Sequence, residues 1–243
     1  RSELTDDQVD TVLARIKDEF DIQPDCSEAE LRRAAATAAA LFEMVDRHGL
    51  GSMAYYYEST PGTVHEDIIT SVILGCSMLT ASGVPIAAEY EVKNAQAMKI
   101  MDSFGAGGSF TEYYCMDFNE DLVLMGHDGP GHTKIAQGKT KVRPLEVYHG
   151  KVGAGVSVEM SVQHGPVTCL SVIEIDGKVS LLLAEGESVP GTTLEIGNTN
   201  SRYRFPIGAR KFVEDWNAAA PAHHCAVGIG HIAGRIEKLG ALL

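Results

Sequence analysis

The spacing of apolar residues predicts helices at the start of the chain. The first stripe at helical spacing consists of Val9, Val12, Leu13 and Ile16. Thr5, a residue type that favours the N-cap, precedes this stripe, so we expect a helix from residue 5 to about residue 20. Ser27 followed by Glu30 has the form of a capping box and predicts a second helix, which should end near Gly49.

Shorter apolar runs then alternate between the patterns of strands and helices. The predicted strands are Met53 to Tyr57 and Val84 to Ala88, and the predicted helices are Val64 to Leu79 and Val92 to Phe104. Alternation of this kind is typical of an α/β layer. We therefore expect residues 1–104 to be an α/β segment that forms part of a larger central domain.

The pattern changes at the flexible stretch Gly105 to Gly108, which predicts a domain boundary. The runs beyond it are rich in β-branched residues and are separated by turn signals such as Asp176-Gly177. The predicted strands are Val156 to Val162, Val167 to Ile175, Lys178 to Ala184 and Thr192 to Ile196. We expect residues 105–243 to form an antiparallel, barrel-like domain whose terminal helices span Ala209 to Ala219 and residues 232–242.

Composition excludes several classes of partner. The chain has 243 residues and a formal charge of −13, so its surface should repel nucleic acids and anionic lipids. An apolar run of about 20 residues, which a membrane helix needs, is absent, and no secretory signal opens the sequence. The five cysteines contain no CxxC pair, which fits a reducing compartment. We expect a cytoplasmic protein without nucleic acid or membrane partners.

Two carboxylates have unusual sequence surroundings. Glu89 follows an apolar strand and precedes a helix, so it either lies at a ligand site or complements the helix dipole as a first-turn glutamate. Glu112 should share a strand face with Phe110 and Tyr114. A carboxylate among aromatic rings needs a compensating partner, unless that face belongs to an exposed edge strand.

Two histidine positions complete the set of candidates. His127 lies in a glycine-rich stretch that indicates a tight loop, where a histidine is commonly solvated but can also contribute to a binding site. His223 and His224 precede a small, apolar segment, and adjacent strand residues point to opposite faces. We therefore expect only one of these two histidines to face a given site.

A mixed set of carboxylates and imidazoles suits Mn²⁺ or a similar divalent cation such as Co²⁺ or Mg²⁺. The spacing Glu-x22-Glu-x14-His-x96-His is not a compact metal motif, so spacing alone does not establish a site. The cysteines do not cluster, which disfavours structural zinc.

Short segments of the chain resemble those of L-arabinose and L-fucose isomerases. Gly108 to Tyr113 is similar to the Ser-Phe-Met-Glu-Asp-Tyr segment of arabinose isomerases, and Met125 to His127 is similar to their Leu-Gly-Ala-His loop. Ala222 to His224 resembles their Gly-Ala-His-His segment, and His224 to Ile232 resembles the closing active-site segment of fucose isomerases. Tyr55 to Glu58 resembles an aromatic-acidic segment that lines the sugar pocket in arabinose isomerases.

The resemblance implies a role for each candidate residue. The implied metal ligands are Glu89, Glu112, His127 and His224; Glu89 and Glu112 would also be the catalytic acid and base, and Tyr57 and His127 would contact the sugar. Most of these ligands lie in the β-rich part. The family also implies a homo-oligomer, either a trimer or a hexamer, and an amino-terminal Rossmann-like region that a separate fragment could supply.

The function that these features predict is a metal-dependent isomerase that interconverts an aldose and a ketose through a cis-enediol. One alternative is a metal-assisted hydrolase, although the sequence does not locate its nucleophile or activated water. Another is a non-catalytic carbohydrate-binding or oligomerisation fragment of an isomerase.

Overall fold

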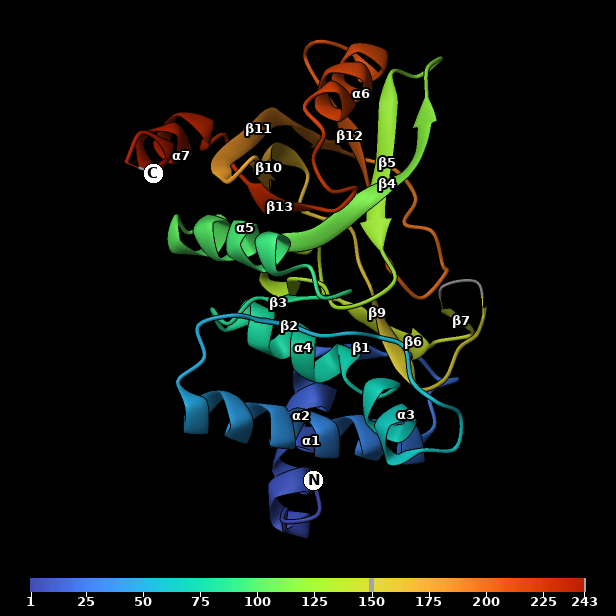
Figure 1. Ribbon diagram of the computed structural model, residues 1–243. Helices are drawn as coiled ribbons and strands as arrows, with labels where there is room; N and C mark the ends of the chain where they lie inside the picture. Colours follow the sequence, from blue (N-terminus) through green and yellow to red (C-terminus); the bar gives the residue numbers. More distant parts are fainter. Residues whose placement is uncertain (149–150, 243) are drawn as a thin grey trace.

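The structure is a computed structural model that describes residues 1–148 and 151–242. Helices α1 and α2 lie at one end of the molecule and a β-barrel lies at the other, with helix α5 alongside the barrel (Figure 1). The predicted combination of helices with an antiparallel barrel is confirmed. The larger α/β layer remains a prediction.

Three of the predicted amino-terminal helices form with nearly the expected bounds: α1 (Asp6–Glu19), α2 (Glu28–His48) and α5 (Val92–Ser103). Two further helices lie between α2 and α5, namely α3 (Val64–Ile69) and α4 (Ile73–Ala81). Ser27 caps α2 through the backbone N–H of Glu30, but the Glu30 side chain pairs with Arg33 instead of closing a capping box. The complete capping box is at α1, between Thr5 and Gln8.

The single helix predicted from Val64 to Leu79 is wrong, because the chain forms α3 and α4 with a break between them. Within the break, the Thr70 hydroxyl donates to the carbonyl of Glu66 at 2.7 Å, and the Ser71 hydroxyl lies 2.8 Å from the carbonyl of Asp67. Side chains that bond back to the preceding turn compete with the regular helical pattern and interrupt it.

Three small sheets accompany these helices. Strands β2 (Met53–Ala54) and β3 (Ile86–Ala87) pair in parallel, and β7 (Val147–Tyr148) pairs with β8 (Lys151–Val152). A three-stranded sheet has the order β1 (Asp21–Ile22), β6 (Lys141–Pro144) and β9 (Val156–Glu159). A short 3-10 helix, η1, spans Thr133–Ile135.

The barrel is closed, and each of its neighbouring strand pairs is antiparallel. In order around the barrel, its strands are β10 (Gly165–Ile175), β11 (Lys178–Val189), β12 (Thr199–Arg204), β5 (Leu122–His127), β4 (Ser109–Asp117) and β13 (Cys225–Ile229). Helix α6 (Ala209–Ala218) contributes Phe212 and Trp216 to the barrel core, and α7 (Ala233–Gly240) follows β13. These two helices confirm the predicted terminal helices.

The strand predicted from Thr192 to Ile196 is wrong, because this segment is a loop that precedes β12. The side chain of Asn200 bonds to the backbone of Leu194, accepting from its N–H at 2.8 Å and donating to its carbonyl at 3.1 Å. The polar backbone groups of Leu194 are therefore satisfied by a side chain rather than by a neighbouring strand.

The cores extend across the predicted boundary at residue 105. Helix α5 packs Met98 and Met101 against Phe110 and other residues of the barrel. On the other side, Val142 and Val158 of the three-stranded sheet share a core with α1, α2 and α4. The division into two domains therefore remains a prediction. Across residues 1–148 and 151–242, no helix has both the length and the apolar character needed to cross a bilayer.

The predicted turn at Asp176-Gly177 joins β10 to β11, and both of its residues have positive φ, 51° and 74°. Positive φ at two consecutive residues is the type I′ hairpin geometry. We expect Gly177→Ala to reduce the free energy of unfolding by about 1 kcal/mol, because a Cβ is strained at this φ although the surrounding space is open. Thermal unfolding should show a midpoint about 2 to 4 °C lower.

Gly234→Ala is the matched control, because Gly234 lies in α7 with open space around it and without positive φ. We expect this control to leave the midpoint unchanged or to raise it slightly. Equal midpoints for the two variants would contradict the assignment of strain to the hairpin turn.

Candidate metal centre

Glu89 lies in a turn between β3 and α5 whose backbone is strained. Glu89 and Tyr90 have φ of 58° and 56°, a left-handed conformation that costs residues with side chains about 1–3 kcal/mol each. The turn is closed by a bond from the Glu91 N–H to the Ala88 carbonyl at 3.0 Å. Helix α5 begins at Val92 and has no acidic residue in its first turn, so the alternative of a first-turn glutamate is wrong.

His127 is the last residue of β5 and is buried, so the loop predicted around it begins only at Asp128. The hydroxyl of Thr199 on β12 holds its backbone, accepting from the N–H at 2.9 Å and donating to the carbonyl at 3.2 Å. The ring of Phe110 meets the imidazole edge-on, with 4.5 Å between centroids. His127 therefore projects from a fixed strand end and not from a solvated turn.

His224 lies immediately before β13 and is also buried. Its ring packs against Phe110, with 4.5 Å between centroids, and within the described part of the chain neither ring nitrogen makes a hydrogen bond. Glu89 Oε2 lies 3.7 Å from Nε2 and Glu91 Oε1 lies 3.6 Å from Nδ1. A buried imidazole without a hydrogen bond is costly unless another group satisfies its nitrogens.

Glu89, His127 and His224 each offer one ligand atom to a group in which these atoms lie within 4.8 Å of one another. His127 Nε2 is 3.5 Å from Glu89 Oε1, and His224 Nε2 is 3.7 Å from Glu89 Oε2. Ligand atoms that share a divalent ion at about 2.0 to 2.2 Å lie about 3 to 4 Å apart. The donor set and its spacing therefore fit a single divalent cation.

Glu112 belongs to a second, overlapping group with His223 and His224. Its Oε2 lies 4.0 Å from His224 Nε2 and 3.6 Å from His223 Nε2. The four predicted ligands thus converge as two groups joined through His224. Strand β4, which carries Glu112, is paired on both sides within the barrel, so the edge-strand alternative is wrong.

The expectation that only one of the paired histidines faces the site is wrong. His223 and His224 precede β13, so strand alternation does not separate them, and both rings reach Glu112. Their centroids are 3.8 Å apart. They differ in burial, because the His223 side chain is 65% exposed whereas that of His224 is 1% exposed.

Further acidic and phenolic side chains lie close to these two clusters of candidate ligands. Asp128 Oδ1 lies 4.0 Å from His127 Nδ1. Burial raises the pKa of the Tyr114 phenol well above its usual range, and the charges of Asp128 and Glu112 raise it further. Tyr114 therefore keeps its proton beside these carboxylates. Sequence reasoning missed Asp128 and Glu91, although Glu91 follows Glu89 by two residues.

Tyr57, the predicted sugar contact, belongs to a group of aromatic rings beside the strained turn. Its ring centroid lies 5.2 Å from that of Tyr56, which stacks on Tyr90 at 5.1 Å. The Tyr56 hydroxyl donates to Glu58 at 3.2 Å. Contact between Tyr57 and a substrate remains a prediction.

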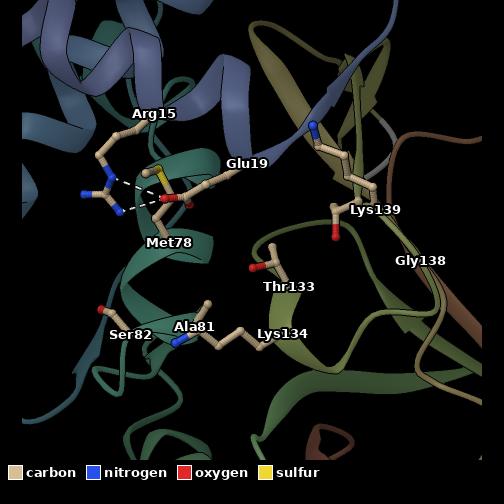
Figure 2. A pocket seen from close by; sticks show the side chains of 10 residues that line it. Arg15, Glu19, Met78, Ala81, Ser82, Thr133, Lys134, Gly138 and Lys139 are labelled. Atoms are coloured by element: carbon tan, nitrogen blue, oxygen red, sulfur yellow. Dashed lines mark hydrogen bonds and ion pairs between the residues drawn. The ribbon is translucent and has the colours of Figure 1, made fainter.

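A separate hollow of about 390 Å³ lies between helices α1 and α4 and the segment around η1. Figure 2 shows the Arg15–Glu19 ion pair at its wall and the side chains of Thr133 and Lys134 below. The two charged groups of this pair are 3.0 Å apart. None of the candidate metal ligands lines this hollow. The candidate metal centre is therefore a feature of the barrel strand ends and the β3–α5 turn.

The fold and the site together describe a closed antiparallel barrel with a candidate divalent-cation centre. Residues 107–243 match the family model described as the L-arabinose isomerase C-terminal domain. The chain is also 26% identical over 230 residues to an L-arabinose isomerase of Clostridium beijerinckii, an alignment that covers 91% of this chain and 45% of that protein.

This chain belongs to the L-arabinose isomerase C-terminal domain family. It spans about half the length of the curated relative that it matches.

Proposed function

We propose that this chain is the metal-binding part of an enzyme that interconverts an aldose and a ketose, with L-arabinose or a related sugar as the substrate. The observation that carries the proposal is the convergence of Glu89, His127 and His224 from separate segments within 4.8 Å. Membership of the arabinose isomerase family supports the reaction class.

The proposed ligands of the cation are Glu89, Glu112, His127 and His224. Carboxylate oxygens and imidazole nitrogens together suit Mn²⁺, and Co²⁺ or Mg²⁺ are the alternatives. When bound, such an ion polarises the sugar carbonyl and stabilises the negative charge that develops on its oxygen. The two neutral imidazoles make the ligand set less negative than a set made only of carboxylates would be.

Isomerisation of an aldose to a ketose moves one proton between C1 and C2 and a second between their oxygens, with no net oxidation. The proposed pair for this transfer is Glu89 and Glu112. One carboxylate removes the proton from the carbon beside the carbonyl, and the other group protonates the carbonyl oxygen. The cis-enediol that results is reprotonated at the other carbon, while its second hydroxyl gives its proton to a carboxylate and becomes the new carbonyl. The exposed His223 is the proposed route for proton exchange between Glu112 and solvent, and its Nε2 lies 3.6 Å from the Glu112 carboxylate.

The proposed assembly is a homo-oligomer, either a trimer or a hexamer, in which other parts complete the sugar pocket. The relative from Clostridium beijerinckii is about twice as long as the aligned region. A separate amino-terminal fragment is a proposed partner of this chain. The residues of this chain that we propose for sugar binding are Tyr57 and His127.

Incubation of the full chain with Mn²⁺ and L-arabinose should produce a ketose, and Glu112→Gln should remove this activity. Ketose formation can be measured by a colorimetric assay or by chromatography. If the chain binds Mn²⁺ and sugar but forms no ketose from any pentose or from fucose, the alternative of a non-catalytic carbohydrate-binding fragment is favoured. Hydrolysis of a glycoside without isomerisation would favour the hydrolase.

A further inference from the structure

The imidazole of His224 lies between two carboxylates that come from the same turn. Glu89 Oε2 is 3.7 Å from Nε2, and Glu91 Oε1 is 3.6 Å from Nδ1. The two glutamates are two residues apart in sequence, yet they approach opposite nitrogens of one ring. The proposed function assigns a role to Glu89 but none to Glu91.

Glu91 occupies a position from which a side chain ordinarily accepts a hydrogen bond from the first turn of the helix. It is the N-cap residue of α5, but its side chain makes no capping hydrogen bond to the described helix. The caps of α1, α2 and α3, which are Thr5, Ser27 and Thr63, each accept from a backbone N–H of the first turn. The carboxylate of Glu91 is instead 3.6 Å from His224 Nδ1.

The surroundings of His224 make the position of its ring proton important. A neutral imidazole carries one N–H and one lone pair, so only one nitrogen can bind a cation. The rings of Phe110, His223 and His127 enclose the imidazole, with centroids 4.5, 3.8 and 5.2 Å away. The Glu91 carboxylate is the acceptor beside Nδ1, whereas Glu89 and Glu112 both lie beside Nε2.

We propose that Glu91 is a positioning residue that holds the ring proton of His224 on Nδ1 and thereby leaves the Nε2 lone pair free to bind the cation. This inference rests on the proposed metal centre. Histidines that bind metals generally donate their other N–H to a carboxylate or carbonyl, which fixes both the tautomer and the ring orientation. Without Glu91 the proton can move to Nε2, where it lies toward Glu89 and blocks coordination.

The tautomer can be measured in the metal-free protein by long-range ¹H–¹⁵N correlation spectra of ¹⁵N-histidine-labelled chain, with His224→Gln to assign the signal. At a pH well above the ordinary histidine pKa of about 6.5, we expect His224 to be the Nδ1–H form. Glu91→Ala should shift it toward the Nε2–H form. Glu91→Gln should keep the Nδ1–H form, because the amide oxygen of Gln still accepts from the ring. An Nε2–H form in the unaltered protein, or no change in Glu91→Ala, overturns the proposal.

Mn²⁺ affinity, measured by isothermal titration calorimetry, gives a second readout. We expect Glu91→Ala to weaken binding about 10- to 100-fold, the usual effect of losing an outer partner of a metal ligand. Glu91→Gln should stay within a few-fold of the unaltered protein, and Glu120→Ala, on the exposed β4–β5 hairpin, should have no effect. Rescue by glutamine separates hydrogen bonding from the carboxylate's charge.

The failure of this inference and the failure of the metal centre are distinguishable. If Glu89→Gln abolishes Mn²⁺ binding while Glu91→Ala leaves it unchanged, the metal centre stands and the role of Glu91 is overturned. If Mn²⁺ binding survives Glu89→Gln, the proposed centre is overturned. In that case the tautomer of His224 in the metal-free protein still decides whether Glu91 holds the ring proton on Nδ1.

Discussion

Replacing Glu89 by glutamine should remove most of the stabilisation that Mn²⁺ gives to the folded protein. A ligand that binds only the native state at about 100 times its Kd stabilises it by about 2.7 kcal/mol. For a chain of this length, that gain corresponds to a rise of about 5 to 10 °C in the unfolding midpoint. If the substitution raises the Kd about 100-fold, the gain at the same Mn²⁺ concentration falls to about 0.4 kcal/mol.

Glu89 contacts both buried imidazoles, with its carboxylate 3.5 Å from His127 and 3.7 Å from His224. Without metal, the variant should be at least as stable as the unaltered protein, because it removes one of several neighbouring negative charges. Differential scanning fluorimetry with and without Mn²⁺ measures both effects, with Glu120→Gln as the matched control. An undiminished Mn²⁺ shift in Glu89→Gln would show that the cation binds elsewhere.

Gly126→Ala should destabilise the protein by about 3 kcal/mol or more, the upper range for overpacking a core. A Cβ at Gly126 would meet the carbonyl oxygen of Thr199 at 1.8 Å and the Cα of Asn200 at 2.9 Å. Both obstacles are backbone atoms of β12, so no side-chain rotation relieves the clash. Either β5 or β12 must shift. Because His127 follows Gly126 directly on β5, a shift of β5 displaces this candidate ligand.

Urea denaturation measures this loss directly, and Mn²⁺ titration of the folded fraction should show weakened binding. Gly51→Ala is the control, since a Cβ there meets nothing within 4 Å and its φ is not positive. We expect the control to change the free energy of unfolding by less than about 0.5 kcal/mol. A Gly126→Ala variant as stable as this control would mean that β5 and β12 do not approach as closely as the structure shows.

Local signals in the sequence predicted most of the helices and some of the strands, but not how the chain assembles them. The type I′ turn at Asp176-Gly177 and the β-branched runs around it predicted the long β10–β11 hairpin. The strand expected from Thr192 to Ile196 failed because Asn200, several residues later, binds the backbone of Leu194. Such a long-range side-chain bond leaves no mark on local hydrophobic periodicity.

The convergence of the candidate ligands could not be derived from their spacing, because barrel pairing produces it. On β4 and β5, Glu112 pairs with Gly126, which places it beside His127. On β13 and β4, Cys225 pairs with Thr111, which brings His224 to the same place. Their sequence surroundings, together with the resemblance of short segments to arabinose isomerases, distinguished these residues from the other acids and histidines of the sequence. Neither signal indicated Glu91, whose approach depends on positive φ at Glu89 and Tyr90.

The position of β13 in the barrel has a consequence for synthesis of the chain. This strand lies between β4 and β10 and closes the ring, although it comes near the carboxy-terminal end of the sequence. During translation, a nascent chain that has emerged only as far as β12 lacks both His224 and the closing strand. Contacts of such high sequence separation form slowly. The candidate metal centre, which needs His224, must therefore be completed among the last events of folding, after the ribosome has released the strand that closes the barrel.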